Sequence, residues 1–202
     1  MNGGLGWVLV GLGLTVLVVR RRTIAVGAVT GQALVLVGLA VRDAGNAGDR
    51  LAAVALAART VGLAAFFLLL ITRTREAGPI RAGVAPLRRG GLGMALALVL
   101  AWLVPTTGLT SRDAGRAVLA LVAFGLVVAA TRRATLFQIL GVVLIENGLV
   151  LAALQLPQTS MLIEVGVAFD LTLIALVGGV FHHRIFAEFG AGDTDALRSL
   201  RD

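Results

Sequence analysis

Long apolar runs, separated by short stretches that carry arginines and turn residues, form the main pattern of this chain. A helix needs about 20 predominantly apolar residues to cross a bilayer, so runs approaching this length favour membrane-spanning helices. Seven runs fit, several of them short and rich in glycine: Leu5 to Val19, Thr23 to Val41, Leu51 to Ile71, Leu92 to Pro105, Ala117 to Thr131, Thr135 to Leu154 and Met161 to Phe181. The pattern predicts an all-α integral membrane protein with about seven transmembrane helices.

The composition agrees with a membrane protein. Of the 202 residues, 58% are hydrophobic and only 14% are charged, whereas a soluble domain has about 25% charged residues. The absence of cysteine excludes disulfides, iron–sulfur ligation and thiolate metal sites. The basic residues include no lysine, a bias typical of GC-rich bacterial genomes, so we expect the protein in a bacterial inner membrane.

The arginines predict the orientation of the helices. Four expected loops are rich in arginine, and the loops between them are poorer or carry the acidic residues Asp43, Asp49 and Asp113. The rich loops contain Arg20 to Arg22, then Arg73, Arg75, Arg81, Arg88 and Arg89, then Arg132 and Arg133, and finally Arg184, Arg198 and Arg201. The positive-inside rule then predicts an outside N-terminus and a cytoplasmic C-terminus. Because these arginines are spread over four loops without interleaved aromatic residues, we expect no nucleic-acid partner.

Three acidic residues lie inside the last two expected spans: Glu146, Glu164 and Asp170. A charge at the centre of a spanning helix costs about 2.5 to 3.5 kcal/mol, so such residues usually have a partner or a function. Counting about 1.5 Å per residue from the cytoplasmic end, Glu146 and Asp170 both lie roughly 17 Å deep. Glu164 is expected nearer the outer surface. Arg59 in the third span lies roughly 18 Å deep, so we predict a charged layer near the midplane.

Three uncharged polar residues are expected to support this layer, namely Gln32, Gln138 and Asn147. One interpretation is a proton or ion pathway, because a single arginine cannot neutralise three carboxylates and one of them should exchange protons near neutral pH. The alternative is structural: Arg59 pairs with Glu146 or Asp170 and only fixes helix packing.

Other signals are weaker. Gly27 and Gly31 form a G-x-x-x-G pattern that is typical of close helix packing in membranes. Trp7 and Trp102 fit interfacial anchors near helix ends. The adjacent His182 and His183 have no third ligand at suitable spacing, so we expect no metal, and no residue grouping supports a nucleophilic enzyme.

Three stretches carry a family resemblance: QILGVVLIENGLVLAALQ from Gln138, MLIEVGVAFDLTLIALVGGVFHHRI from Met161, and DTDALRSL in the tail. They resemble the hydrogenase-4 component E family, which is related through its last three helices to the K subunit of respiratory complex I and to the C subunit of Mrp-type antiporters. The most specific parts are E-N-G at Glu146 and E-x-G-x-x-x-D from Glu164 to Asp170. The resemblance covers Thr135 to Leu200 and is only architectural before that.

The resemblance implies a four-helix membrane region over residues 1–113, a three-helix region similar to the K subunit over 114–184, and a cytoplasmic tail over 185–202. It implies a non-catalytic membrane subunit of a complex similar to hydrogenase or formate hydrogenlyase, beside antiporter-like and anchor subunits in the lipid bilayer. Glu146, together with Asp170 or Glu164, would relay protons without a cofactor. Arg59 stands where the family has a mid-span lysine. Because arginine effectively never loses its proton, we expect Arg59 to tune the acids electrostatically. The alternative function is a structural spacer between membrane modules.

Overall fold

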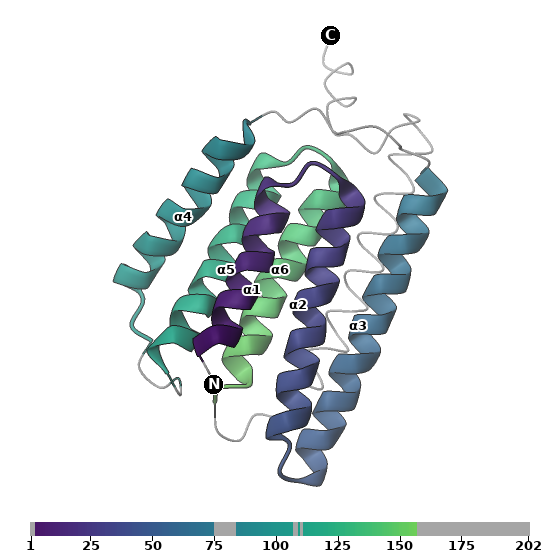
Figure 1. Ribbon diagram of the computed structural model, residues 1–202, viewed down its shortest axis with the longest axis vertical. Helices are drawn as coiled ribbons and strands as arrows, with labels where there is room; N and C mark the ends of the chain where they lie inside the picture. The colour runs from purple at the N-terminus through teal and green to yellow at the C-terminus, as the bar shows by residue number, and fades with distance from the viewer. Residues whose placement is uncertain (1–2, 75–83, 107–108, 110, 157–202) are drawn as a thin grey trace.

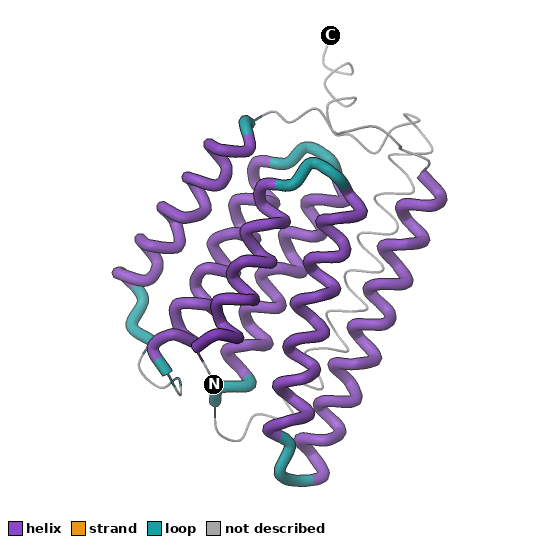
Figure 2. Tube along the Cα trace, viewed as in Figure 1, coloured by secondary structure: helices purple, strands orange, loops and turns teal. Residues whose placement is uncertain are grey.

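The computed structural model describes residues 3–74, 84–106, 109 and 111–156, and these form six helices. In chain order the helices are α1 (Gly3–Val18), α2 (Arg22–Asp43), α3 (Ala47–Thr74), α4 (Pro86–Leu103), α5 (Arg112–Thr131) and α6 (Thr135–Ala153). The described residues contain no strand (Figure 2). The first six expected spans are therefore confirmed as helices. The seventh expected span, Met161 to Phe181, and the tail lie outside the described residues.

The helix bounds differ most from the predicted runs at the starts of α4 and α5, which begin before the apolar residues do. Pro86 opens α4, a position where proline fits because its missing N–H needs no partner there. Ser111 caps α5, and its hydroxyl accepts a hydrogen bond from the Ala114 N–H at 3.1 Å. The hydrophobic pattern alone misses these first turns because each contains arginine, which interrupts the apolar run.

Figure 1 shows α1, α2, α5 and α6 side by side in the centre of the bundle, with α4 on one flank and α3 on the other. Helix α5 packs against α6, α4 and α1, while α3 packs against α2. Five of these helices are long and apolar enough to cross a membrane, and α1 is shorter at 16 residues. Large apolar side chains such as Val61 and Leu98 are exposed on the flanking helices. This is the architecture of an all-helical, multi-pass membrane protein.

The closest helix contact is between α5 and α6. A Cβ atom added at Gly125 would lie 2.5 Å from the Gly141 carbonyl oxygen, and one at Gly141 would lie 2.8 Å from the Ala129 nitrogen. The two backbones can approach this closely only because both positions are glycine.

Within the described residues, the prediction that Gly27 and Gly31 form a close-packing face is wrong. A Cβ at Gly27 meets nothing within 4 Å, and one at Gly31 makes only an ordinary contact of 3.7 Å with Leu12. Gly27 is exposed on α2. The spacing permits close approach, but no neighbouring helix among the described residues lies on that face.

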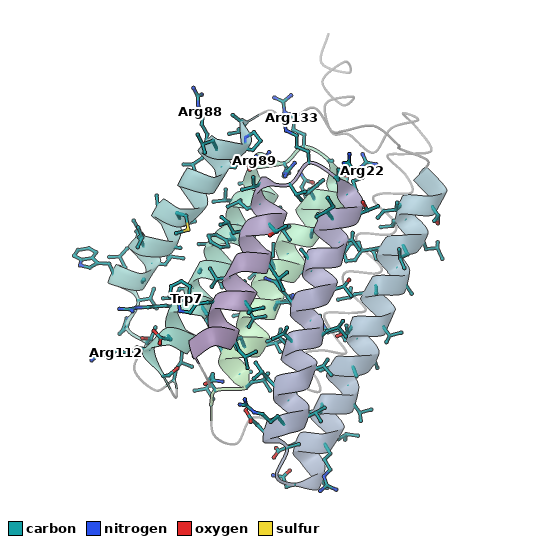
Figure 3. All side chains as sticks on the ribbon, viewed as in Figure 1. Trp7, Arg22, Arg88, Arg89, Arg112 and Arg133 are labelled. Atoms are coloured by element: carbon teal, nitrogen blue, oxygen red, sulfur yellow. The ribbon has the colours of Figure 1, made fainter. Side chains whose placement is uncertain are left out.

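Arginines gather at one end of the bundle. Figure 3 shows Arg22, Arg88, Arg89 and Arg133 at the end where α2, α4 and α6 begin, whereas Trp7 and Arg112 lie toward the opposite end. The described acidic residues outside the bundle interior, Asp43, Asp49 and Asp113, belong to that opposite end. The alternation of arginine-rich and arginine-poor loops is thus confirmed for the described residues. The assignment of the arginine-rich end to the cytoplasm stays a prediction.

Candidate charged site within the bundle

Arg59 and Glu146 form an ion pair in the interior of the bundle. The Nη2 group of Arg59 in α3 donates a hydrogen bond to Oε2 of Glu146 in α6. The Arg59 side chain is 1% exposed and that of Glu146 is 10% exposed. Breaking such a pair by removing one partner is costly because the other charge is left uncompensated. Pairing of Arg59 with Glu146 is one of the two contacts that the structural alternative names, and it is present here; the proton-relay role stays a prediction.

Two amide side chains extend the pair across the bundle. Arg59 Nη1 donates to the Asn147 side-chain oxygen at 3.2 Å, and Asn147 Nδ2 donates to Oε1 of Gln32 in α2 at 3.3 Å. Gln32 Nε2 then donates to the carbonyl oxygen of Leu9 in α1 at 2.8 Å. Arg59, Asn147 and Gln32 are each fully buried. One hydrogen-bonded chain thus connects α6, α3, α2 and α1.

The sequence of α6 explains why Glu146 and Asn147 face the other helices of this chain. Gly148 turns toward α5, where an added Cβ would lie 3.2 Å from the Val118 carbonyl oxygen. Successive residues of a helix are separated by about 100° around its axis. With Gly148 against α5, the Asn147 side chain points about 100° to the side and that of Glu146 to about the opposite face, and both bond Arg59 from α3.

The network lies near the middle of each helix. At about 1.5 Å per residue, Glu146 is roughly 17 Å from the start of α6, Arg59 roughly 18 Å from the start of α3 and Gln32 roughly 15 Å from the start of α2. A hydrocarbon core is about 30 Å thick. The charges therefore sit near its centre when the bundle spans a bilayer.

The Nε group of Arg59 is buried and has no hydrogen-bond partner within the described part of the chain. The guanidinium therefore bonds Glu146 and Asn147 through two of its three nitrogens, and its third nitrogen, Nε, has no bond within the described residues. A buried donor of this kind favours an additional acceptor, which can be a water molecule or a second carboxylate.

The remaining predicted residues divide into two groups. Gln138 lies apart from the network, because its Nε2 donates to the Arg132 carbonyl oxygen at 3.1 Å near the start of α6. Asp170 and Glu164 lie outside the described residues. Sequence reasoning missed the Leu9 carbonyl, which no side-chain pattern reveals.

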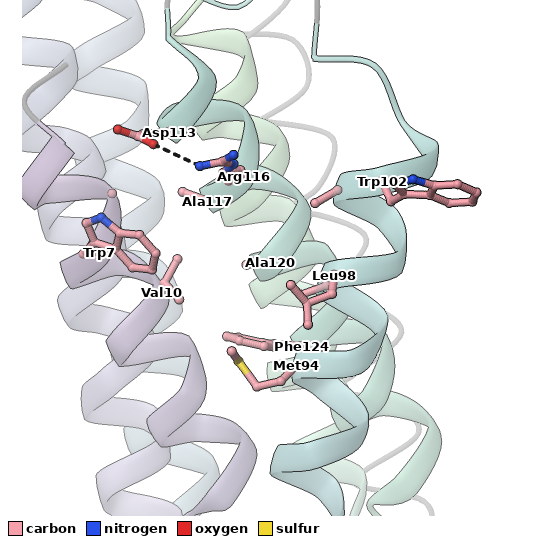
Figure 4. A pocket seen from close by; sticks show the side chains of 13 residues that line it. Trp7, Val10, Met94, Leu98, Trp102, Asp113, Arg116, Ala117, Ala120 and Phe124 are labelled. Atoms are coloured by element: carbon pink, nitrogen blue, oxygen red, sulfur yellow. Dashed lines mark ion pairs between the residues drawn. The ribbon is translucent and has the colours of Figure 1, made fainter.

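A separate apolar groove opens between α1 and α4 over the small residues of α5 (Figure 4). Its volume is about 440 Å³, and its walls include Val10, Met94, Leu98 and Phe124. Trp7 and Trp102 line it and are 66% and 85% exposed. At its polar end Arg116 and Asp113 form an exposed ion pair of 3.8 Å. The groove shares no residue with the buried network. Among the described residues no three His, Cys, Asp or Glu side chains are grouped as metal ligands.

Comparisons with protein-family models, curated proteins and solved structures gave no match. The family resemblance therefore depends on the sequence motifs around Glu146, Glu164 and Asp170.

Proposed function

We propose that this chain is a non-catalytic subunit in the membrane arm of an oxidoreductase complex, similar to the hydrogenase-4 component E family, and that it contributes carboxylates to proton translocation. The observation that carries the proposal is the ion pair of Arg59 and Glu146, buried at mid-depth and linked through Asn147 and Gln32 to α1. Ionisable residues inside a membrane bundle are rare, and those that occur mark ion pathways and proton relays in many membrane proteins.

The chemistry assigns different tasks to the two charged residues. Glu146 can gain and lose a proton, whereas Arg59 keeps its charge and stabilises the ionised carboxylate. When Glu146 takes up a proton, the pair loses its attraction and the guanidinium needs another anion. The available Nε donor of Arg59 fits this step. Asp170 and Glu164 are the proposed further relay sites, so proton transfer would alternate which acid Arg59 stabilises.

The partners follow from the same proposal. Antiporter-like and anchor subunits would surround the chain in a bacterial inner membrane, and the redox chemistry would take place in other subunits. The chain has no cysteine with which to hold an iron–sulfur cluster.

The test is proton translocation by the reconstituted complex, with Glu146→Gln as the variant. We expect coupled proton movement to fall at least tenfold while the complex still assembles, because glutamine keeps the shape but cannot exchange protons. Asp113→Asn is the matched control: it also removes one carboxylate, but from an exposed surface pair, and we expect unchanged coupling. Normal coupling in the Glu146→Gln complex would contradict the relay.

A structural spacer is the second candidate, and one observation favours it. Arg59 bonds two adjacent residues of α6, so it fixes α3 to α6 although these helices are not close neighbours in the described bundle. A spacer predicts that Glu146→Gln reduces the amount of assembled complex but leaves coupling per assembled complex intact. Measuring both quantities on the same preparation separates the two functions.

A further inference from the structure

Arg89 is a buried arginine without a hydrogen-bond partner among the described residues. It lies in the first turn of α4, at the arginine-rich end of the bundle (Figure 3). The residue is 0% exposed, and its Nε, Nη1 and Nη2 atoms are all buried without a hydrogen bond to any described residue. An unpaired buried cation is among the most costly groups in a protein. A role as a topological signal does not explain the burial of Arg89, because an exposed arginine such as its neighbour Arg88 can serve as that signal.

Arg132 lies beside Arg89 in the short connection between α5 and α6. Its Nη2 group donates to the carbonyl oxygens of Val19 and Leu17 at the end of α1, and its guanidinium carbon lies 4.0 Å from the centre of the Phe137 ring. Its Nε and Nη1 atoms are buried and unpartnered among the described residues. Burial, followed by the positive charges of Arg89 and Arg20, lowers the pKa of Arg132 to about 9. Arg132 is therefore still a cation at neutral pH, and it experiences repulsion from the positive charges of Arg89 and Arg20.

The helix starts at this end add to the positive potential. Helices α2, α4 and α6 begin here after Arg21, Ala85 and Ala134, and none of these residues caps its helix with a side-chain hydrogen bond. At the opposite end, Ser111 caps α5, and Asn46 accepts from the Asp49 N–H at 2.9 Å at the start of α3. Uncapped N–H groups and the helix dipole favour an anion.

We propose that Arg89 and Arg132, with exposed Arg20 at the rim, form a binding site for a phosphate group at the arginine-rich end of the bundle. A phosphate has several strong acceptor oxygens and matches the planar donor fork of arginine. It would satisfy the unpartnered nitrogens of both guanidinium groups and remove the repulsion among the three cations. The phosphate can belong to the headgroup of an anionic phospholipid, because the ends of spanning helices lie at the level of the headgroups. It can also be free phosphate from the aqueous side.

The test is native mass spectrometry of the full chain in neutral detergent, titrated with phosphatidylglycerol, with phosphatidylcholine and with inorganic phosphate. We expect wild type to bind phosphatidylglycerol in preference to phosphatidylcholine. The variant Arg89→Gln should weaken that binding about tenfold or more, the loss expected when charge-assisted hydrogen bonds disappear. Arg88→Gln is the matched control, because it removes the same charge from the next, exposed position. It should bind as wild type does.

The two phosphate sources give different results. Competition between inorganic phosphate and phosphatidylglycerol at Arg89 identifies a site for the phosphate group itself. Binding of phosphatidylglycerol that depends on Arg89 but resists inorganic phosphate identifies a lipid headgroup site. Equal loss in the Arg88→Gln and Arg89→Gln variants, or equal binding of both lipids by wild type, would overturn the proposal.

Thermal stability measured without ligand distinguishes a loss of binding from a folding defect. Because Arg89 bonds no described residue, Arg89→Gln should leave the thermal stability in neutral detergent unchanged or raised, while the stabilisation by phosphatidylglycerol disappears. If Arg89→Gln does not fold, Arg89→Lys replaces it. Lysine keeps the charge but loses the planar fork, so its affinity should fall between those of wild type and a neutral variant. Wild-type affinity in a folded Arg89→Lys protein would then overturn the proposed role of the guanidinium.

Discussion

Arg59 is a permanent charge in the middle of an apolar bundle, and its partners are what make that position tolerable. Glu146 supplies the opposite charge, and Asn147 supplies a neutral acceptor. The side chain reaches between helices that do not pack closely against one another. Removing Glu146 would therefore leave a guanidinium that no neighbouring described carboxylate can neutralise.

A double-mutant cycle on this pair measures its energetic coupling. We expect Arg59→Leu or Glu146→Leu alone to destabilise the protein by about 3 to 5 kcal/mol, because each leaves one buried charge unpaired. The double variant should be more stable than the sum of the two losses predicts. The measurement is reversible unfolding of the purified chain in mixed micelles. The exposed Arg116 and Asp113 pair provides the control cycle, in which coupling should be about 0 to 1 kcal/mol. Additive losses at Arg59 and Glu146 would show that the pair does not act as a unit.

At this scale the sequence placed Arg59 and Glu146 at one depth, because helix depth can be counted from the ends of apolar runs, but it left open whether Arg59 pairs with Glu146 or with Asp170. It also predicted Asn147 and Gln32 as polar support. Gln138 was not distinguished from them, although it precedes Asn147 by nine residues and therefore points to about the opposite side of α6. The burial of Arg89 could not be predicted, because the positive-inside rule treats it and the exposed Arg88 alike.

Close packing of α5 against α6 holds Glu146 and Asn147 in place, and it depends on Gly125 and Gly141. We expect Gly141→Ala to destabilise the protein by about 1 to 3 kcal/mol, because the added methyl group would meet the backbone of α5 on two sides. Gly27→Ala is the matched control within the same bundle. Its methyl group would enter open space, and alanine favours helix more than glycine does, so stability should be unchanged or up to about 1 kcal/mol higher.

Unfolding temperatures of the two variants in the same detergent test this prediction, and equal effects at Gly141 and Gly27 would contradict it. The contrast also shows what sequence pattern omits at the scale of an element. Both glycines belong to apolar helices, but only the contacts between helices reveal that Gly141 faces a backbone and Gly27 faces outward. The existence of the six described helices follows from the apolar runs, whereas the choice of packing faces depends on the whole bundle.

At the scale of the whole molecule, the two ends of the bundle differ in charge and in helix capping. At the arginine-rich end, with the proposed phosphate site, the starts of α2, α4 and α6 have no side-chain cap. At the opposite end, where Trp7 lies (Figure 3), Ser111 caps α5 and Asn46 bonds the Asp49 N–H at the start of α3. The positive-inside rule assigns the arginine-rich end to the cytoplasm. If this orientation holds, a phosphate site there would meet anionic lipids of the inner leaflet.

The absence of cysteine from the chain makes this orientation directly testable. Ala47→Cys places a thiol at the exposed start of α3, and Arg21→Cys places one at the exposed start of α2, at the other end. In intact bacterial cells, a membrane-impermeant maleimide should label Ala47→Cys, while Arg21→Cys should react only after the inner membrane is opened. Wild type is the background control and should not react at all. The reverse labelling pattern would invert the orientation, and labelling of both positions in intact cells would mean that the bundle does not separate the two compartments as proposed.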